Sequence, residues 1–340
     1  MRYPEFLQEG GTIGFVAPSF GCAIEPYKTA FQNAIQLFEK KGYHTLLGPN
    51  CYSDTGIGIS NTPKRCAGEL TDSYCSRESD VLISCGGGEL MCEILPFVEW
   101  EKIKNAKPKW YMGYSDNTNF TFLSTTLCDT AAIYGPCAAA FGMEPWHDAI
   151  GDAFDVLCGK KSDVTNYKLW EKESLKNEQA PLLPYHVTEP VRIQSFGDDK
   201  VTMSGRLLGG CMDCLVTLLG TEFDHTKEFI ETYRKDGIIW FLEACDLNIM
   251  SIRRAIWQMK HAGWFSHVKG FLIGRPLCFG ETGFGIDQYR AVTDLLAEYQ
   301  VPILMDLDIG HLAPMMPIVS GALADVSFVD GSFHMKYRYE

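Results

Sequence analysis

The chain has little positive charge and no long apolar run, and both absences exclude classes of function. Its 30 Lys and Arg residues are outnumbered by 43 Asp and Glu residues, which gives a formal net charge of −13. Nucleic-acid binding needs a basic surface that contacts phosphates, and no run of Lys or Arg is present. No segment reaches the length of a membrane-spanning helix, and Met1–Glu9 lack an apolar signal core. We therefore expect a cytoplasmic protein with no nucleic-acid and no membrane partner.

Sequence signatures of nucleotide and metal binding are missing as well. Neither a Walker lysine motif nor a Gly-x-Gly-x-x-Gly fingerprint occurs. Of the thirteen cysteines only Cys211 and Cys214 form a close pair, and a zinc ribbon needs a second pair. Scattered cysteines are typical of buried thiols in a reducing compartment. We interpret this pair as structural; a redox role is the alternative, although the surrounding sequence is unlike thioredoxin.

What the chain does contain is an alternation of strand and helix patterns. Its 340 residues, 46% of them hydrophobic, fit a globular protein with a large core and room for two domains. Up to Gly135, short apolar runs alternate with helical segments such as Tyr27–Lys41, in which Phe31, Ile35 and Phe38 share one face. This alternation predicts a parallel sheet with helices on both faces, and ligands of such sheets bind beyond the carboxyl ends of the strands.

The patterns divide the chain into three regions. Residues 1–141 form an N-terminal α/β domain. Residues 142–200 are rich in charge and proline, so we expect a connector with an irregular insertion there. Residues 201–340 alternate strand and helix again and end in a hairpin that turns at Asp330–Gly331. The predicted fold class is therefore α/β, with two domains.

Ser115 lies where the predicted strand Lys109–Tyr114 ends and a helix begins. On such a turn a serine hydroxyl is held out of the sheet, beside the N–H groups at the positive end of the helix. An acyl-transfer nucleophile needs this geometry. The alternative is a plain helix cap, because Ser, Asp, Asn and Thr are the residues preferred at helix starts.

Three other strand ends carry residues suited to chemistry. Glu243 ends an apolar strand, and its carboxylate is either paired or solvated just past the sheet edge. His311 follows a strand and a glycine, and histidine suits general-base chemistry near neutral pH. Gly86–Gly88 follow another strand, where their N–H groups either approach an oxyanion or belong to a tight turn before a helix.

Taken together, these segments resemble the LD-carboxypeptidase family of serine peptidases, including its microcin C immunity branch. The match covers most of the chain and follows the family's order. Its further motifs are the opening strand Thr12–Ser19, Leu95–Phe97, the nucleophile motif Gly113–Thr118, Tyr134–Pro136, Gly205–Arg206, Gly209–Gly210, Pro317 and Gly321. The chain departs from many relatives at Glu89 and Leu90 and at Cys211–Cys214, where an asparagine is common.

The resemblance implies a fold and a mechanism. The fold is a flavodoxin-like N-terminal domain with a parallel sheet and a C-terminal mixed β/α domain, with the active site between them. Ser115 is implied as the nucleophile, His311 as the general base and Glu243 as the group that orients the base. A serine hydroxyl is a poor nucleophile without such a base, and the base needs a third group to set its tautomer.

The resemblance also implies the remaining parts of the site. The oxyanion hole is formed by the backbone N–H groups of Asp116 and of Gly88 or Gly87. No metal and no organic cofactor is required, and family members are commonly homodimers.

For the substrate, the resemblance implies an amide bond near a free carboxyl end. We expect an L,D-bond of a peptidoglycan tetrapeptide first, with a peptidyl or aminoacyl nucleotide as the alternative. A non-catalytic or nucleotide-binding α/β protein is the more distant alternative. An aromatic side chain would stack on a base, unless it packs in the core, and a cation would bind a terminal carboxylate. The residues considered for these contacts are Trp170, Trp146, Arg206, Arg275, Arg253 and Arg254.

Overall fold

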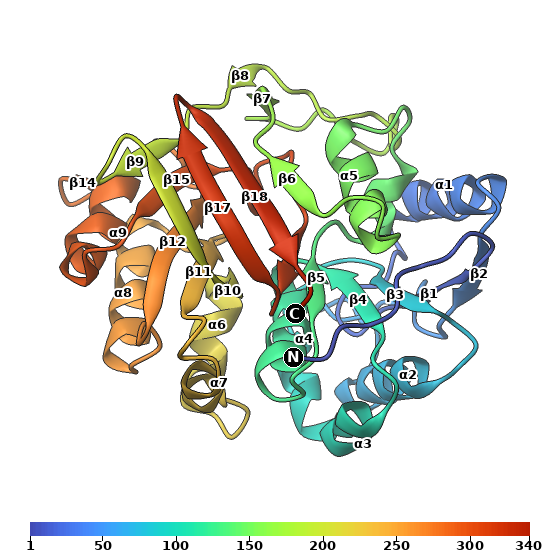
Figure 1. Cartoon of the computed structure of the whole chain (residues 1–340). Helices are drawn as coiled ribbons and strands as arrows, with labels where there is room; N and C mark the ends of the chain where they lie inside the picture. Colours follow the sequence, from blue (N-terminus) through green and yellow to red (C-terminus); the bar gives the residue numbers. More distant parts are fainter.

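The computed structural model describes residues 1–340 and contains two large sheets that lie side by side (Figure 1). The strands of the first sheet are β1 (Thr12–Val16), β2 (His44–Leu47), β3 (Val81–Ser84), β4 (Trp110–Gly113), β5 (Ala132–Tyr134) and β16 (Ile318–Ser320). In space they follow the order β16-β5-β4-β3-β1-β2, and β1 to β5 are parallel. Strands β3, β4 and β5 are buried along their whole length, as expected for a parallel sheet covered on both faces.

Helices connect these strands and cover the sheet, and η marks the 3₁₀ helices. They are α1 (Tyr27–Lys40), α2 (Pro63–Cys75), η1 (Met91–Phe97), α3 (Trp100–Asn105), η2 (Ser115–Asn117), α4 (Thr118–Thr126), η3 (Ala138–Gly142) and α5 (Asp148–Leu157). The predicted helix after Glu89 is the 3₁₀ helix η1, in which Pro96 has no N–H to donate. No helix of the structure combines the length and the apolar character needed to cross a bilayer.

The second sheet is mixed. Its strands are β6 (Asp163–Thr165), β9 (Gln194–Phe196), β10 (Val201–Cys211), β11 (Ile238–Glu243), β12 (Val268–Gly274), β15 (Ile303–Leu307), β17 (Leu323–Val329) and β18 (Ser332–Arg338). They follow the order β6-β18-β17-β10-β11-β12-β15-β9, in which β10, β11, β12 and β15 are parallel. Strands β17 and β18 form the predicted hairpin around Asp330–Gly331.

The remaining elements flank the second sheet. They are the helices α6 (Met212–Leu218), α7 (Thr226–Thr232), α8 (Ile249–His261), α9 (Gln288–Leu296) and η4 (Ala297–Tyr299), and the short strand pairs β7 (Leu169–Trp170) with β8 (Glu189–Pro190) and β13 (Thr282–Gly283) with β14 (Ile286–Asp287). The two-part architecture with parallel strands in both sheets confirms the predicted fold class.

Two segments differ from the expected organisation. Residues 142–200 were expected to be irregular, but they contain α5 and supply β6 and β9 to the two edges of the second sheet. Strand β16 comes from the C-terminal region and pairs antiparallel with β5 in the first sheet, with Ile318 opposite Tyr134. Strands of two or three residues are too short to show a hydrophobic period. The boundaries after residues 141 and 200 stay predictions.

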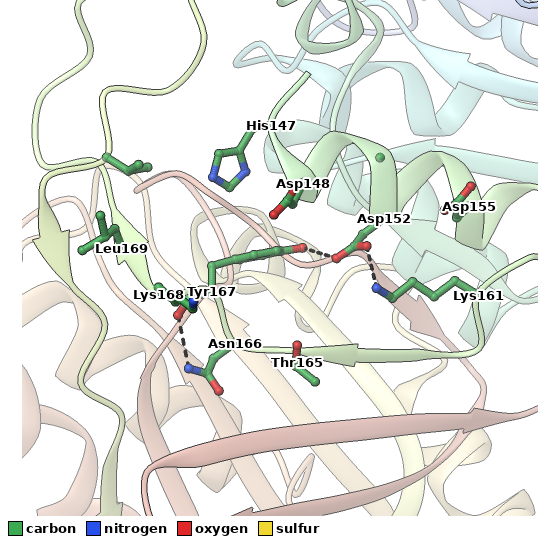
Figure 2. Close-up of a pocket in the computed structure, with 12 residues that line it drawn as sticks. His147, Asp148, Asp152, Asp155, Lys161, Thr165, Asn166, Tyr167, Lys168 and Leu169 are labelled. Atoms are coloured by element: carbon green, nitrogen blue, oxygen red, sulfur yellow. Dashed lines mark hydrogen bonds and ion pairs between the residues drawn. The ribbon is translucent and has the colours of Figure 1, made fainter. Parts of the chain in front are cut away.

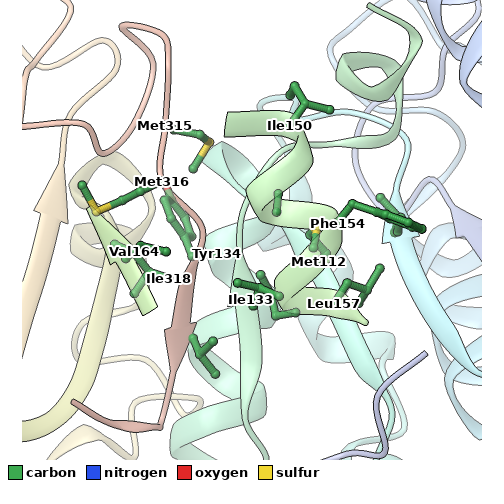
Figure 3. Close-up of a cluster of buried hydrophobic side chains, with 14 of the residues drawn as sticks. Met112, Ile133, Tyr134, Ile150, Phe154, Leu157, Val164, Met315, Met316 and Ile318 are labelled. Carbon is green, nitrogen blue, oxygen red and sulfur yellow. The ribbon is translucent and has the colours of Figure 1, made fainter. Parts of the chain in front are cut away.

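One buried cluster of apolar side chains joins the two sheets. Figure 3 shows Ile133 and Tyr134 of β5 close to Ile318 of β16, with α5 and β6 contributing to the same cluster. Burial of apolar surface stabilises a protein by about 25 cal/mol per Å². Because this core is continuous, the ends of strands from both sheets are held at a fixed separation.

Arg206 stabilises the start of the second sheet and is not free to bind a ligand. Its side chain is almost fully buried, and its Nε and Nη2 atoms donate to Asp236 Oδ2 over 3.0 and 2.6 Å. Its Nη1 atom donates to the Gly321 carbonyl over 2.6 Å, and the guanidinium lies 4.1 Å from the centre of the Tyr233 ring. The expectation that Arg206 binds a substrate carboxylate is therefore corrected, because an internal carboxylate already occupies it.

We predict that Arg206→Met lowers the free energy of unfolding by roughly 3 kcal/mol, since removing one partner of a buried ion pair leaves the other charge uncompensated. Arg338→Met is the matched control, because Arg338 pairs with Asp325 on the surface, where such pairs contribute about 0–1 kcal/mol. Urea unfolding at neutral pH measures both variants. Equal, small losses for the two variants would contradict the structural role given to Arg206.

Candidate active site

Three residues that are remote in the sequence meet where strands of both sheets end. Ser115 follows β4, Glu243 is the last residue of β11, and His311 follows β15. The His311 Nε2 atom lies 2.9 Å from Ser115 Oγ, and His311 Nδ1 lies 2.8 Å from Glu243 Oε2. A hydroxyl, an imidazole and a carboxylate hydrogen-bonded in this order are the parts from which a serine nucleophile is activated. We call these three residues the triad.

The turn that carries Ser115 is strained. Ser115 has a backbone φ of +63°, in the left-handed region that a residue with a side chain rarely occupies. Such a conformation costs about 1–3 kcal/mol and persists only where the surroundings enforce it. Neither η2 nor α4 has a side-chain capping hydrogen bond, so Ser115, Asp116 and Asn117 do not act as the plain caps considered above. The strained turn instead directs the Ser115 hydroxyl towards His311.

The two residues after Ser115 fasten the turn to the glycine loop and to the segments on either side of it. The Asp116 carboxylate accepts hydrogen bonds from the Ser19 hydroxyl and, over 2.8 Å, from the Met91 N–H. The Asn117 amide donates to the Gly86 carbonyl over 2.8 Å. Burial raises the pKa of Asp116, and its hydrogen bonds partly offset that rise. The side chains of the nucleophile motif therefore hold together the backbone segments that border the hydroxyl.

The glycine loop approaches Ser115 closely. A Cβ atom on Gly87 would lie 3.1 Å from Ser115 Oγ, and a Cβ atom on Gly88, whose φ is +124°, would collide with the Ser19 hydroxyl. Glycine lets the backbone pass this close to the Ser115 side chain. The Asp116 N–H belongs to the first turn of a helix, where donors have no intrahelical partner. The assignment of the Asp116, Gly87 and Gly88 N–H groups to an oxyanion hole stays a prediction.

The carboxylate and the imidazole shift each other's pKa values in opposite directions. Burial of Glu243 raises its pKa, but the facing His311 and hydrogen bonds from His311, Tyr134 and Cys211 outweigh burial, so the pKa of Glu243 is lowered. Burial of the ring lowers the pKa of His311, but Glu243 together with the Cys245 thiol outweighs this, so the pKa of His311 is raised well above its usual range. The pair therefore favours a charged carboxylate beside a protonated imidazole, so His311 accepts a proton only above its raised pKa.

Sequence reasoning missed the role of the Tyr134 side chain. The Tyr134 hydroxyl donates to Glu243 Oε1 over 2.5 Å and accepts from the Ser115 N–H over 3.3 Å. The sequence marked Tyr134 only as part of the segment Tyr134–Pro136 and gave its side chain no role, because a tyrosine at the end of a strand is ordinary core composition. The one signal available was its place in the family's Tyr-Gly-Pro segment.

Three cysteines lie around the triad. The Cys214 thiol donates to the Ser115 carbonyl over 3.6 Å, the Cys211 thiol helps to lower the pKa of Glu243, and the Cys245 thiol helps to raise the pKa of His311. All thirteen cysteines are free thiols. No group of three or more His, Cys, Asp or Glu side chains is arranged to ligate a metal ion.

Comparison of this chain with models of known protein families identifies its family. Residues 13–135 match the LD-carboxypeptidase N-terminal domain, and residues 204–326 match the LD-carboxypeptidase C-terminal domain. The chain belongs to the LD-carboxypeptidase family. It is thus a serine peptidase of this family, as the resemblance implied.

Curated relatives span the whole LD-carboxypeptidase chain. The microcin C7 self-immunity protein MccF of Escherichia coli is 27% identical over 98% of this chain and 95% of its own length. A putative carboxypeptidase of Vibrio cholerae is 25% identical over 100% of this chain and 99% of its own. A putative carboxypeptidase of Bacillus subtilis is 25% identical over 97% of each chain.

Solved structures of relatives share the fold. MccF in complex with glutamyl sulfamoyl guanosine superimposes with a TM-score of 0.82 at 24% identity, covering 99% of this chain and 98% of MccF. An MccF-like protein from Bacillus anthracis gives a TM-score of 0.81 at 20% identity, covering 99% of this chain and all of the other. Both comparisons support the two-domain arrangement of this LD-carboxypeptidase.

Arg275 is occupied inside the protein, which corrects its expected role in substrate binding. Its guanidinium donates to the Asp308 carboxylate and, over 2.7 Å, to the Asp306 carbonyl, and both members of the Arg275–Asp308 pair are almost fully buried. Burial raises the pKa of Asp308, which the Arg275 charge partly offsets. Because Asp308 lies just before His311, this ion pair fastens the segment that carries the imidazole.

Trp170 packs against the same ion pair. Its ring lies 5.1 Å from the Arg275 guanidinium and 5.3 Å, edge to face, from the ring of Phe279. The side chain is 6% exposed, so neither of these contacts leaves a face open for a base to stack on. The core-packing alternative weighed for Trp170 therefore holds in this structure.

A cavity of about 670 Å³ lies elsewhere, between α5 and the segment after β6 (Figure 2). Its polar wall includes Asp152, which accepts from Lys161 Nζ over 2.6 Å and from the Tyr167 hydroxyl over 2.9 Å. No triad residue lines this cavity. Of its charged groups, Asp152 and Lys161 pair with each other, and none is hydrogen-bonded to a nucleophile and a base as in the triad, which we therefore take as the candidate active site.

We predict that Glu243→Gln lowers the pKa of His311. The carboxylate charge that raises this pKa is removed, while the burial that lowers it remains. NMR titration of the histidine rings measures the change, with His311→Asn identifying the His311 signal. Asp163→Asn is the matched control, because Asp163 pairs with His334, 3.2 Å away, and leaves His311 untouched. An unchanged His311 titration in Glu243→Gln would contradict the electrostatic coupling described here.

Proposed function

We propose that this protein is a serine hydrolase that cleaves an acyl–nitrogen bond through an acyl-enzyme formed on Ser115. The supporting observation is the continuous series of hydrogen bonds from Ser115 Oγ through His311 to Glu243. Transient loss of the Ser115 proton to His311 makes the oxygen nucleophilic, and Glu243 stabilises the imidazolium that forms.

In the proposed mechanism, Ser115 Oγ attacks the substrate carbonyl carbon while its proton moves to His311 Nε2. The carbonyl oxygen becomes an oxyanion that the N–H groups of Asp116 and of Gly87 or Gly88 stabilise; such a donor is typically worth about 10²–10³ in rate. His311 then returns the proton to the leaving nitrogen, and the carbon–nitrogen bond breaks. A water molecule, deprotonated by His311, hydrolyses the acyl-enzyme and restores Ser115.

For the substrate, we propose an aminoacyl or peptidyl nucleotide. Its curated relative MccF is a self-immunity protein, and MccF has been solved with aspartyl sulfamoyl adenosine as well as with the guanosine compound. The chain covers MccF over nearly its full length. In addition, Arg206 and Arg275 are held in internal ion pairs, so neither supplies the cation that a free terminal carboxylate would need.

A peptidoglycan tetrapeptide is the second candidate substrate. The relatives from Vibrio cholerae and Bacillus subtilis are described as putative carboxypeptidases. Cleavage would then remove the terminal residue at an L,D-bond by the same acyl-enzyme steps. The homodimeric state and the cytoplasmic location also stay predictions, which sedimentation and cell fractionation test.

We predict that the protein hydrolyses aspartyl sulfamoyl adenosine and that Ser115→Ala lowers kcat on the order of 10⁴-fold or more, because the nucleophile is lost. Mass spectrometry of reactions with this compound and, separately, with a murein tetrapeptide identifies the products. Hydrolysis of the tetrapeptide alone would favour the second candidate. Hydrolysis of neither compound, with Ser115→Ala and the unaltered protein indistinguishable, would refute both substrate proposals.

We also predict that kcat/KM rises with pH through the raised pKa of His311. Below that pKa the imidazole is protonated and cannot accept the Ser115 proton, so the general-base step is lost as the pH falls. In Glu243→Gln the pKa of His311 is lower, so the rise moves to lower pH while the maximal rate drops. Rate profiles between about pH 5 and pH 10 check both statements. A profile that falls with rising pH over this range would contradict the assignment of His311 as the base.

A further inference from the structure

The Tyr134 hydroxyl joins the acid of the triad to the backbone of the nucleophile. It donates to Glu243 Oε1 over 2.5 Å and accepts the Ser115 N–H over 3.3 Å. Tyr134 is the last residue of β5 and lies opposite Gly113 of β4, just before the strained turn. On its other side it lies opposite Ile318 of β16, in the segment that follows His311. The hydroxyl of Tyr134 thus bonds Glu243 and the Ser115 backbone, while its own backbone lies opposite the segment that follows His311.

The position of this hydroxyl is fixed by packing. Tyr134 is fully buried, with its ring centre 5.5 Å from that of Phe241 and 6.3 Å from that of Tyr114. Figure 3 shows the ring among apolar side chains of both sheets, beside Met316 and Ile318. A ring confined in this way presents its oxygen at one place, so its hydrogen bonds are preorganised.

A buried carboxylate needs partners for both of its oxygens. Glu243 is fully buried, and Oε2 faces His311 Nδ1. The Tyr134 hydroxyl is the donor to Oε1, and the nearby Cys211 thiol, a weak donor, is directed to Asp213 Oδ2 over 3.3 Å. A buried anion with too few hydrogen bonds raises the free energy of the folded protein. Rotation of a glutamate carboxylate about its terminal bond meets only a low barrier, so without this hydroxyl the carboxylate would rotate away from its present orientation.

We propose that Tyr134 is a positioning residue that holds the Glu243 carboxylate towards His311 and ties it to the Ser115 turn. This inference rests on the proposed function, in which Glu243 orients the general base. Tyr134 itself does not touch the reacting atoms; it acts through Glu243. Loss of its hydroxyl therefore affects the chemical step rather than substrate binding.

We predict that Tyr134→Phe lowers kcat on the order of 10- to 100-fold, the loss that removal of a supporting hydrogen-bond partner typically causes at metal-ligating side chains. We expect KM to change less than about twofold, because Tyr134 acts through Glu243. Aspartyl sulfamoyl adenosine is the probe substrate. Tyr43→Phe is the matched control, because it removes a buried phenol whose hydroxyl contacts only the Cys158 sulfur, 3.7 Å away. Equal kcat values for the two variants would overturn the proposal.

A double-mutant cycle separates positioning from a general loss of stability. If Tyr134 acts through Glu243, then adding Tyr134→Phe to Glu243→Gln lowers kcat much less than Tyr134→Phe alone, because the interaction is already lost. If the two losses multiply independently, the proposed role is refuted. Thermal unfolding of each variant, compared with Tyr43→Phe, shows whether the proteins are folded at the assay temperature.

One readout does not depend on any substrate. The NMR resonance of the His311 Nδ1–H proton reports its hydrogen bond to Glu243. We expect this resonance to shift or broaden in Tyr134→Phe and to stay in place in Tyr43→Phe. If the unaltered protein hydrolyses no compound offered, the proposed function fails, yet this resonance still tests the positioning of Glu243. An unchanged resonance in Tyr134→Phe would refute the inference whether or not hydrolysis is observed.

Discussion

A carboxylate that is fully removed from water must be paired, and the site is organised around this requirement at Glu243. Its two oxygens are satisfied by an imidazole from the segment after β15 and a phenol from β5. Charge burial without partners would cost more than a marginally stable protein can tolerate. Folding of the second sheet with a charged Glu243 at the end of β11 therefore requires the first sheet to be in place beside it. The contacts that stabilise the buried Glu243 carboxylate are therefore also the contacts that position the triad side chains.

The strained turn at Ser115 depends on the same arrangement. A residue with a side chain occupies the left-handed region only where its surroundings outweigh the cost. Here Asn117 bonds to the Gly86 carbonyl of the glycine loop, and Asp116 accepts from the Met91 N–H of η1. The Arg275–Asp308 pair plays the corresponding role for the segment that carries His311. Both supports lie outside the triad, and both use charged or polar side chains that are buried inside the protein.

Local sequence patterns predicted much of this fold, and the reason is physical. Strands such as Val81–Ser84 and helices such as Tyr27–Lys40 carry their own hydrophobic period, and the Asp330–Gly331 turn carries its own backbone preference. Ser115, Glu243 and His311 were recognised because each stands at a strand end within a family motif. The structure places these three within hydrogen-bond distance of one another.

The features that escaped prediction are those whose partners are remote in the sequence. Tyr134 and Glu243 are 109 positions apart, and no local pattern marks a tyrosine whose hydroxyl meets a distant carboxylate. The sequence neighbours of Arg275 do not reveal Asp308, which directly follows β15, the next strand of the sheet. Strand β16 has three residues, which are too few to show the alternating hydrophobic pattern of a strand. Its partner β5 belongs to the other half of the chain, so no local pattern predicts their pairing.

Strand β16, which joins the C-terminal part of the chain to the first sheet, also limits how far the two sheets can separate. Since β16 follows the His311 segment and is paired with β5, swinging one sheet away from the other would break the ladder between Ile318–Ser320 and Ala132–Tyr134. It would also expose the apolar side chains packed around this ladder. A hinge motion that separates the two halves is therefore unfavourable, and the framework that holds the three triad side chains stays rigid.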